Sequence, residues 1–143
     1  MKLLMLHSFT GTAAHFARCA CSLSRALSRR VSRPHSKTQV LSDLLAQDGI
    51  ECVYLDGPHT QPVANIEAVG FENAMQLVSD PDDPPRAWWC AQEDANGDKQ
   101  YFGFDESIAH VRDAILREGP FEGALGFSQG ALISALARMV LRR

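Results

Sequence analysis

The chain has 143 residues, of which 45% are apolar and 22% charged, with a formal net charge of −3. These values are typical of one soluble, globular domain that can bury a sizeable core. No apolar run in the sequence approaches the length of a membrane span, which excludes a membrane-spanning helix from the predicted elements.

The chain opens with an apolar run at residues 1–6, followed by His7 and a short polar stretch up to Gly11. We expect a buried strand near residues 2–6, in the middle of a sheet, that opens into a loop. A secretory signal is the alternative, with Lys2 as its basic end. The apolar core before His7 is too short for that role.

Residues 17–36 differ from the rest of the chain because they are rich in arginine and serine and contain no acidic residue. We interpret them as a poorly ordered or weakly helical insertion that the fold does not need. A nucleic-acid patch is one alternative, but no aromatic residues are interleaved with the arginines. A transit peptide is another, but such a segment belongs at the N-terminus and not after a strand.

The four cysteines, Cys19, Cys21, Cys52 and Cys90, do not have the spacing of a zinc site or of a redox pair. We therefore expect free thiols in a reducing compartment, and hence a cytoplasmic or nuclear protein.

Residues 36–49 have the apolar spacing of a helix, with Gly49 as its stop, and residues 50–55 have the composition of a second strand. The stretch 57–86 holds five of the seven prolines. It is long and polar, so we expect an irregular loop region above a site.

After a turn at residues 96–98, the clearest helix in the chain covers residues 105–118. We expect Asp105 to cap its start and Gly119-Pro120 to end it. A third strand near residues 123–127 and a helix at 129–142 follow. Strands that alternate with helices in this way predict a parallel sheet with helices on both faces.

The pattern Gly-x-Ser-x-Gly spans residues 126–130, between that short apolar run and a long run of helix-forming residues. The two glycines let strand and helix approach each other, so that Ser128 Oγ stands clear above the sheet. The helix N-terminus adds positive potential where negative charge develops. We interpret this turn as a nucleophile elbow. The alternative is a plain turn between strand and helix.

Six motifs, in this order, resemble the FSH family of serine hydrolases, an α/β-hydrolase family common in fungi and also found in animals. The likeness covers nearly the whole chain except residues 17–36. The six motifs are Leu6-His7-Ser8-Phe9-Thr10, Tyr54-Leu55-Asp56-Gly57-Pro58-His59, Arg86-Ala87-Trp88-Trp89, Phe104-Asp105-Glu106-Ser107, Gly119-Pro120-Phe121 and Gly126-Phe127-Ser128-Gln129-Gly130.

The resemblance implies an α/β fold of the α/β-hydrolase-like three-layer sandwich type, with a parallel sheet that is incomplete at its C-terminal side. Residues 1–143 would be the N-terminal portion of one such domain. The implied reaction is hydrolysis of a small acyl ester or thioester through an acyl-enzyme on Ser128. No metal, organic cofactor, nucleic acid or membrane is implied.

By the same resemblance, the backbone N–H groups of Phe9 and Gln129 would form the oxyanion hole. They would donate to the negatively charged oxygen that forms when Ser128 attacks the acyl carbon. Trp88 and Trp89 would wall an acyl pocket. Equally, the two tryptophans could anchor a loop to the core.

Two departures from the family pattern stand out. Ser8 occupies a position where the family has glycine, which would distort the oxyanion loop if that position needs a positive φ. The 15 residues after Ser128 include no Asp, Glu or His, although the acid and base of an α/β-hydrolase follow the serine. The chain stops where we expect those partners to begin.

His7 and His59 follow strands on the side where the elbow opens, and either is an alternative base. Hydrogen bonds that shape loops also account for both. The remaining histidines, His15, His35 and His110, have no site context. Three functions stay open: a serine hydrolase, a non-catalytic truncated hydrolase fold that is inert or serves interactions, and an arginine-rich nucleic-acid binder that rests on residues 17–36 alone.

Overall fold

A computed structural model describes residues 1–19, 40–68 and 84–140. Its centre is a three-stranded parallel sheet in the order β2-β1-β7. These strands are Lys2–Leu6 (β1), Glu51–Leu55 (β2) and Gly123–Gly126 (β7). β1 therefore has a neighbour on each side, and the predicted central position of the first strand is confirmed.

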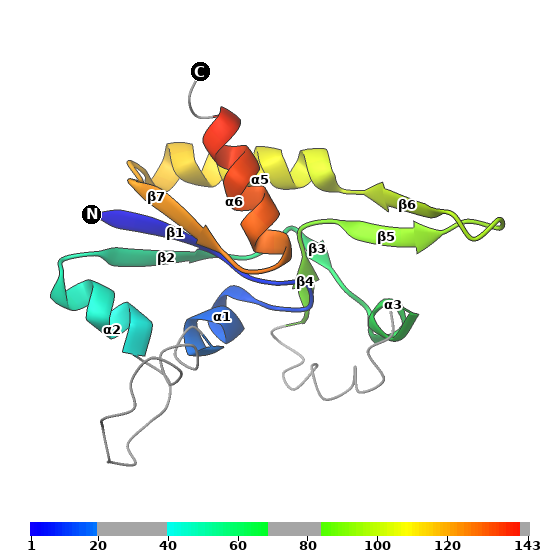
Figure 1. Ribbon diagram of the computed structural model, residues 1–143, viewed down its shortest axis with the longest axis horizontal. Coiled ribbons are helices and arrows are strands. Elements are labelled where there is room, and N and C mark those ends of the chain that lie inside the picture. The colour runs from blue at the N-terminus through cyan, green and yellow to red at the C-terminus, as the bar shows by residue number, and fades with distance from the viewer. Residues whose placement is uncertain (20–39, 69–83, 141–143) are drawn as a thin grey trace, which may run out of the picture.

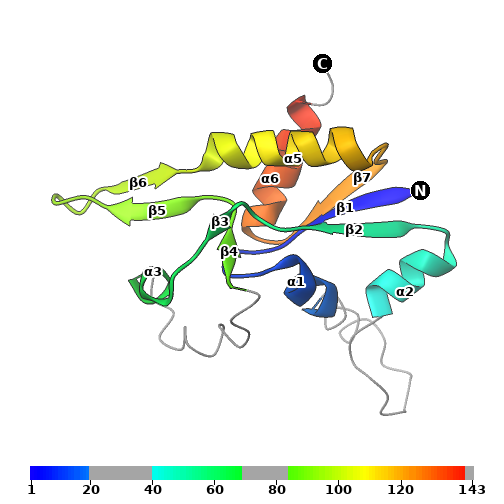
Figure 2. The same cartoon turned by 180° about the vertical axis from the view of Figure 1, so that it is seen from behind.

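Helices lie on both sides of this sheet (Figures 1 and 2). Helices α1 (Ala13–Cys19) and α2 (Val40–Gln47) lie on one side, and α5 (Phe104–Glu118) and α6 (Gln129–Val140) on the other. The predicted alternation of strands and helices around a parallel sheet is thus confirmed. Of the proposed insertion, residues 17–19 belong to α1 and residues 20–36 lie outside the described residues.

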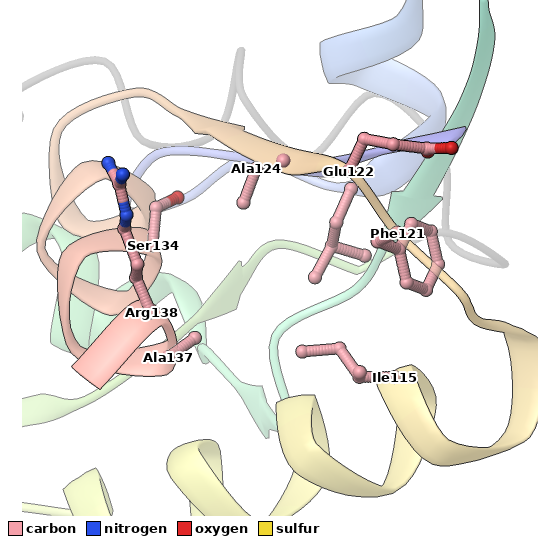
Figure 3. Close-up of a pocket in the computed structure, with 9 residues that line it drawn as sticks. Ile115, Phe121, Glu122, Ala124, Ser134, Ala137 and Arg138 are labelled. Carbon is pink, nitrogen blue, oxygen red and sulfur yellow. The ribbon is translucent and has the colours of Figure 1, made fainter. Parts of the chain in front are cut away.

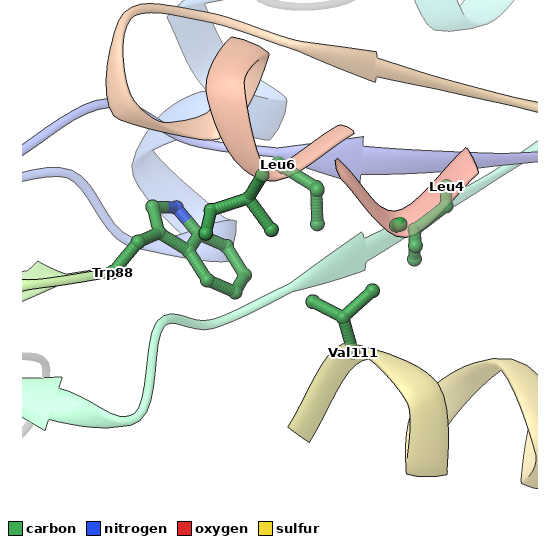
Figure 4. Packing of buried hydrophobic residues seen from close by; sticks show 6 residues of the cluster. Leu4, Leu6, Trp88 and Val111 are labelled. Carbon is green, nitrogen blue, oxygen red and sulfur yellow. The ribbon is translucent and has the colours of Figure 1, made fainter. Parts of the chain in front are cut away.

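The main core lies between the sheet and the α5–α6 layer. Leu4 and Leu6 are two residues apart along β1, so their side chains point to the same side of the sheet. There they contact Val111 of α5 and Ile133 of α6. Trp88 joins this cluster and is fully buried (Figure 4). On the opposite side of the sheet, the ring of Phe16 in α1 packs edge-on against Tyr54 of β2, with 6.0 Å between the ring centroids.

The stretch 57–86 is more structured than the sequence predicts. It contains two short antiparallel strands, β3 (His59–Thr60) and β4 (Arg86–Ala87), and the helix α3 (Val63–Ala68). Residues 69–83 lie outside the described part of the chain. The expectation of a wholly irregular loop is wrong at β3, α3 and β4, because strands of two residues and a helix of six residues are too short to give a recognisable periodic pattern.

A hairpin that the sequence pattern did not predict follows Trp89. Its strands β5 (Cys90–Glu93) and β6 (Lys99–Phe102) are antiparallel and project away from the sheet (Figure 1). The predicted turn lies at its tip, where Asp94 Oδ1 accepts hydrogen bonds from the backbone N–H groups of Asn96 (2.8 Å) and Asp98 (3.0 Å). These N–H groups lower the pKa of Asp94.

Helix boundaries follow the predictions with one difference. α2 is described from Val40 to Gln47, and the predicted helical residues 36–39 lie outside the described part of the chain. Gly49 beyond α2 has a φ of 72°, as expected of a glycine stop. α5 begins at Phe104, with Gly103 as its N-cap at a φ of 85° and no side-chain cap. The expectation that Asp105 caps this helix is wrong, because Asp105 already lies inside the first turn.

Candidate active site

The elbow between β7 and α6 presents Ser128 at the carboxyl edge of the sheet. Ser128 has a φ of 54°, in the left-handed region that non-glycine residues rarely adopt, and its side chain is exposed. A Cβ atom at Gly126 would lie 2.1 Å from the carbonyl oxygen of Gly130. Strand and helix are therefore as close as the nucleophile-elbow interpretation requires.

The loop after β1 lies directly beside this elbow. Leu6 is paired with Gly126, and the backbone N–H of Phe127 donates to the carbonyl oxygen of Leu6 over 3.1 Å. A Cβ atom at Gly130 would lie 2.2 Å from the Leu6 oxygen and 2.6 Å from the His7 oxygen. The fold therefore brings the segment that carries Phe9 to the same edge of the sheet as Ser128 and Gln129.

The residue at the family's glycine position needs no special backbone freedom. Among the described residues other than glycine, only Thr10 and Ser128 have a positive φ. Ser8 is not one of them, and its carbonyl oxygen accepts from the N–H of Gly11 in a tight turn (3.1 Å). The distortion that a serine would cause at a positive φ therefore does not arise here.

His7 is buried and both of its ring nitrogens contact the backbone. Nε2 accepts from the N–H of Gly57 over 2.8 Å, so the proton is on Nδ1, which donates to the carbonyl oxygen of Ser8 over 2.7 Å. The nearest Asp56 oxygen is 3.9 Å from Nε2. This geometry gives His7 a role in shaping the loop next to the elbow.

His59 and His110 also contact backbone groups. His59 Nε2 lies 2.7 Å from the carbonyl oxygen of Gly103, and His110 Nε2 lies 3.0 Å from that of Asp56. Both contacts hold segments together that are far apart in the sequence. His15 lies on α1 with an exposed side chain, and His35 lies outside the described residues.

The two tryptophans differ in position. The Trp88 side chain is 0% exposed, its indole N–H donates to the His7 carbonyl oxygen over 2.8 Å, and its ring is 5.3 Å from the His7 ring. Trp89 is half-buried and packs on Phe104, with 5.7 Å between the ring centroids. Trp88 thus occupies the place of a core anchor, and Trp89 is the more accessible of the two.

The side chain of Gln129 makes contacts that sequence reasoning missed. Its Oε1 accepts from the N–H of Trp88 (2.9 Å), and its Nε2 donates to the carbonyl oxygen of Trp89 (3.1 Å). The partners are 41 and 40 residues away along the chain. No local sequence pattern predicts such a contact. A side-chain amide, which is both donor and acceptor, is nevertheless well suited to bridging two backbone groups.

A cavity of about 360 Å³ lies elsewhere, between β7, α5 and α6 (Figure 3). Ile115, Phe121, Ala124 and Ala137 give it apolar walls, and Ser134, Glu122 and Arg138 add polar groups. Neither Ser128 nor Gln129 lines it. This cavity is therefore separate from the elbow.

Metal-binding clusters and membrane-spanning helices are both absent from the described ranges. In residues 1–19, 40–68 and 84–140, no three His, Cys, Asp or Glu side chains gather as they would around a metal ion. No helix within the same ranges has the length and apolar character to cross a membrane. Cys52 and Cys90 are free thiols, and burial raises the pKa of Cys52.

A family model described as serine hydrolase (FSH1) matches residues 1–143. The chain belongs to the FSH1 serine hydrolase family. The resemblance inferred from six motifs is therefore confirmed, and it places the chain in a family of esterase-type enzymes.

Individual FSH1 relatives bear names of the same kind. The chain is 36% identical over 106 residues to a zebrafish protein named esterase OVCA2. The aligned residues cover 70% of this chain and 46% of the relative. The chain is 37% identical over 94 residues to human esterase OVCA2, covering 60% of this chain and 40% of the relative. A Drosophila melanogaster protein named esterase CG5412 is 34% identical over 100 residues. The chain thus spans less than half the length of the first two relatives.

Proposed function

We propose that Ser128 is the nucleophile of a hydrolase that cleaves carboxylic esters or thioesters of small acyl substrates. The observation that carries the proposal is the exposed Ser128 at a φ of 54°, between a central sheet and a helix N-terminus. Holding a residue other than glycine in this left-handed region of backbone conformation costs free energy, and residues held in this way cluster at functional sites. Membership of the FSH1 family and the esterase names of its relatives support the same chemistry.

In the reaction proposed for residues 1–143, Ser128 Oγ attacks the acyl carbon and its proton passes to solvent water. The carbon–oxygen or carbon–sulfur bond to the leaving group then breaks, and the leaving group takes a proton. Water attacks the resulting acyl-enzyme, releases the carboxylic acid and restores Ser128. The N–H groups of Gln129 and Phe9 are the proposed donors to the oxyanion, and the first turn of α6 adds positive potential.

The proposed architecture is that of an α/β-hydrolase-like three-layer sandwich. The helices on both faces of the β2-β1-β7 sheet support it. Because Trp88 is fully buried, the proposed wall of an acyl pocket rests mainly on Trp89. Trp88 would support that wall from behind.

A non-catalytic role is the second candidate, and the histidines favour it. His7, His59 and His110 all contact backbone groups, and no Asp, Glu or His follows Ser128 in the 143 residues. Without a base, a serine hydroxyl is a poor nucleophile near neutral pH. We therefore expect residues 1–143 by themselves to react slowly, through the elbow and oxyanion donors alone.

The test is acetylation by p-nitrophenyl acetate, followed by mass spectrometry of the intact protein and its peptides. The proposal predicts one slowly formed acetyl group on Ser128 and none in Ser128→Ala. Ser134→Ala is the matched control, because Ser134 lies in α6, just after the elbow, and donates to the Gly130 carbonyl oxygen. Acetylation that persists in Ser128→Ala would favour the non-catalytic candidate.

A further inference from the structure

The side chain of Gln129 ties the elbow to the segment that contains Trp88 and Trp89. Its amide meets two adjacent backbone groups, accepting from the Trp88 N–H at 2.9 Å and donating to the Trp89 carbonyl oxygen at 3.1 Å. Both distances are those of well-formed hydrogen bonds. The elbow residue next to Ser128 is therefore held at two points by a segment from another part of the chain.

That segment is itself fixed to the loop after β1. The fully buried Trp88 ring donates its Nε1 proton to the His7 carbonyl oxygen over 2.8 Å, and Ser107 Oγ donates to the Trp88 carbonyl oxygen. Trp88 thus contacts Gln129 through its backbone and His7 through its ring. One rigid residue connects the elbow to the loop that leads to Phe9.

We propose that the Gln129 side chain is a positioning residue, which sets the Ser128–Gln129 peptide in register with the loop containing Phe9. The inference rests on the proposed function, in which the N–H groups of Gln129 and Phe9 stabilise the oxyanion. Oxyanion donors act only when they lie within a narrow distance of the developing charge. A displacement of about 1 Å can lower a rate roughly 100-fold.

The chemistry of the position requires an amide. Glutamine supplies one acceptor for the Trp88 N–H and one donor for the Trp89 carbonyl oxygen. An ionised carboxylate keeps the acceptor but has no donor, and it faces a carbonyl oxygen. Methionine has a similar length and supplies neither strong donor nor strong acceptor. These two residues therefore separate the contributions of the two hydrogen bonds.

The experiment compares the rate of Ser128 phosphonylation by a fluorophosphonate in wild type, Gln129→Met and Gln129→Glu. Gln92→Met, on the exposed face of β5, is the matched control. We expect Gln129→Met to react about 10- to 100-fold more slowly, while Gln92→Met keeps the wild-type rate. All four proteins should keep a cooperative thermal transition.

The pH profile distinguishes positioning from a general effect on folding. When the carboxyl introduced by Gln129→Glu is protonated, its O–H can donate to the Trp89 carbonyl oxygen. The rate of Gln129→Glu relative to wild type should therefore rise as pH falls from about 7 to about 4, a range that spans the ordinary pKa of a glutamate. His7, whose ring lies 5.3 Å from the Trp88 ring, is the same in both proteins. A ratio that does not change with pH would overturn the proposal.

A second readout does not depend on reactivity. Amide resonances in ¹H–¹⁵N spectra should shift at Phe9 and Ser128 in Gln129→Met and stay in place in Gln92→Met. An unmoved Phe9 resonance, or an unchanged labelling rate in Gln129→Met, would overturn the positioning role. If wild type and Ser128→Ala label alike, the proposed function fails, and the spectra still decide whether Gln129 sets the position of Phe9.

Discussion

Gly126 and Gly130 are the residues whose lack of a side chain makes the elbow possible. Between them, Ser128 takes a left-handed conformation, and α6 starts directly against the end of β1. Backbone atoms surround both glycines, so the neighbours of a new Cβ atom cannot move aside by a side-chain rotation. The geometry of the elbow is therefore fixed by sterics.

Gly130→Ala should be strongly destabilising, because its Cβ would lie 2.2 Å from the Leu6 carbonyl oxygen. We expect a loss of about 3 kcal/mol or more, and a fall in Tm of about 10 °C or more. Gly123→Ala is the control, since its Cβ would meet only the flexible end of Leu3, at 3.2 Å. Equal Tm values for the two variants would contradict this account.

The position of Ser128 in a tight turn between a strand and a helix could be predicted from the sequence, because its two glycines and its flanking strand and helix are local features. The hydrogen bonds of the Gln129 side chain reach residues about 40 positions away, so they depend on tertiary structure. Whether His7 was a base or a loop-shaping residue also needed the structure, which shows the partners of both ring nitrogens.

Elements with a strong apolar pattern were the predictable ones. β1 is buried on both faces and α5 has a clear apolar face, so both were placed within one residue. The hairpin β5–β6 was missed because its strands are almost wholly exposed and their residues do not alternate between apolar and polar, the pattern that marks a half-buried strand. The only local sign of this hairpin was the Asn96-Gly97 pair at its tip.

The start of β7 is held to β1 by a carboxylate. Glu122 Oε2 accepts from the backbone N–H of Lys2 over 2.5 Å, and the Glu122 N–H donates to the Lys2 carbonyl oxygen over 3.0 Å. The Lys2 N–H lowers the pKa of Glu122 from its ordinary value of 4.5. The ionised form of Glu122 is therefore favoured in the folded state.

This contact should add to the acid sensitivity of the fold. Because the folded-state pKa is the lower one, the stabilisation is present above the unfolded pKa and is lost as pH falls through the folded pKa. Urea unfolding at about pH 7 and about pH 3 should show a smaller loss of stability for Glu122→Gln than for wild type. Glu93→Gln, on the distant hairpin, is the control. An equal loss in wild type and Glu122→Gln would contradict the expectation.

For the molecule as a whole, the exposed apolar surface is the main feature. Within the described residues β7 pairs only with β1, and several large apolar side chains on β7, the elbow and α6 are exposed. They are Leu125 (39%), Phe127 (56%), Leu132 (48%) and Met139 (69%). Leu132 and Met139 therefore give α6 an exposed apolar face. Such surfaces and sheet edges favour association.

We therefore expect residues 1–143 to associate as their concentration rises, and Leu132→Lys with Met139→Lys to reduce this association. The double variant should keep a Tm within a few degrees of wild type, since both side chains are exposed. Ile133→Lys, at a fully buried position, should unfold the protein instead. Sedimentation velocity over a range of concentrations is the measurement. A wild type that stays monomeric at every concentration would contradict the prediction.

The most direct test of the central claim is the time course of labelling of residues 1–143 by a fluorophosphonate, with the modified residue mapped by mass spectrometry. We predict one adduct, on Ser128, that is absent from Ser128→Ala. It should form slowly, several orders of magnitude below the rate of an intact triad. An adduct on another residue would contradict Ser128 as the nucleophile. Rapid labelling of Ser128 would show that a base exists within these residues and would contradict the structural roles given to their histidines.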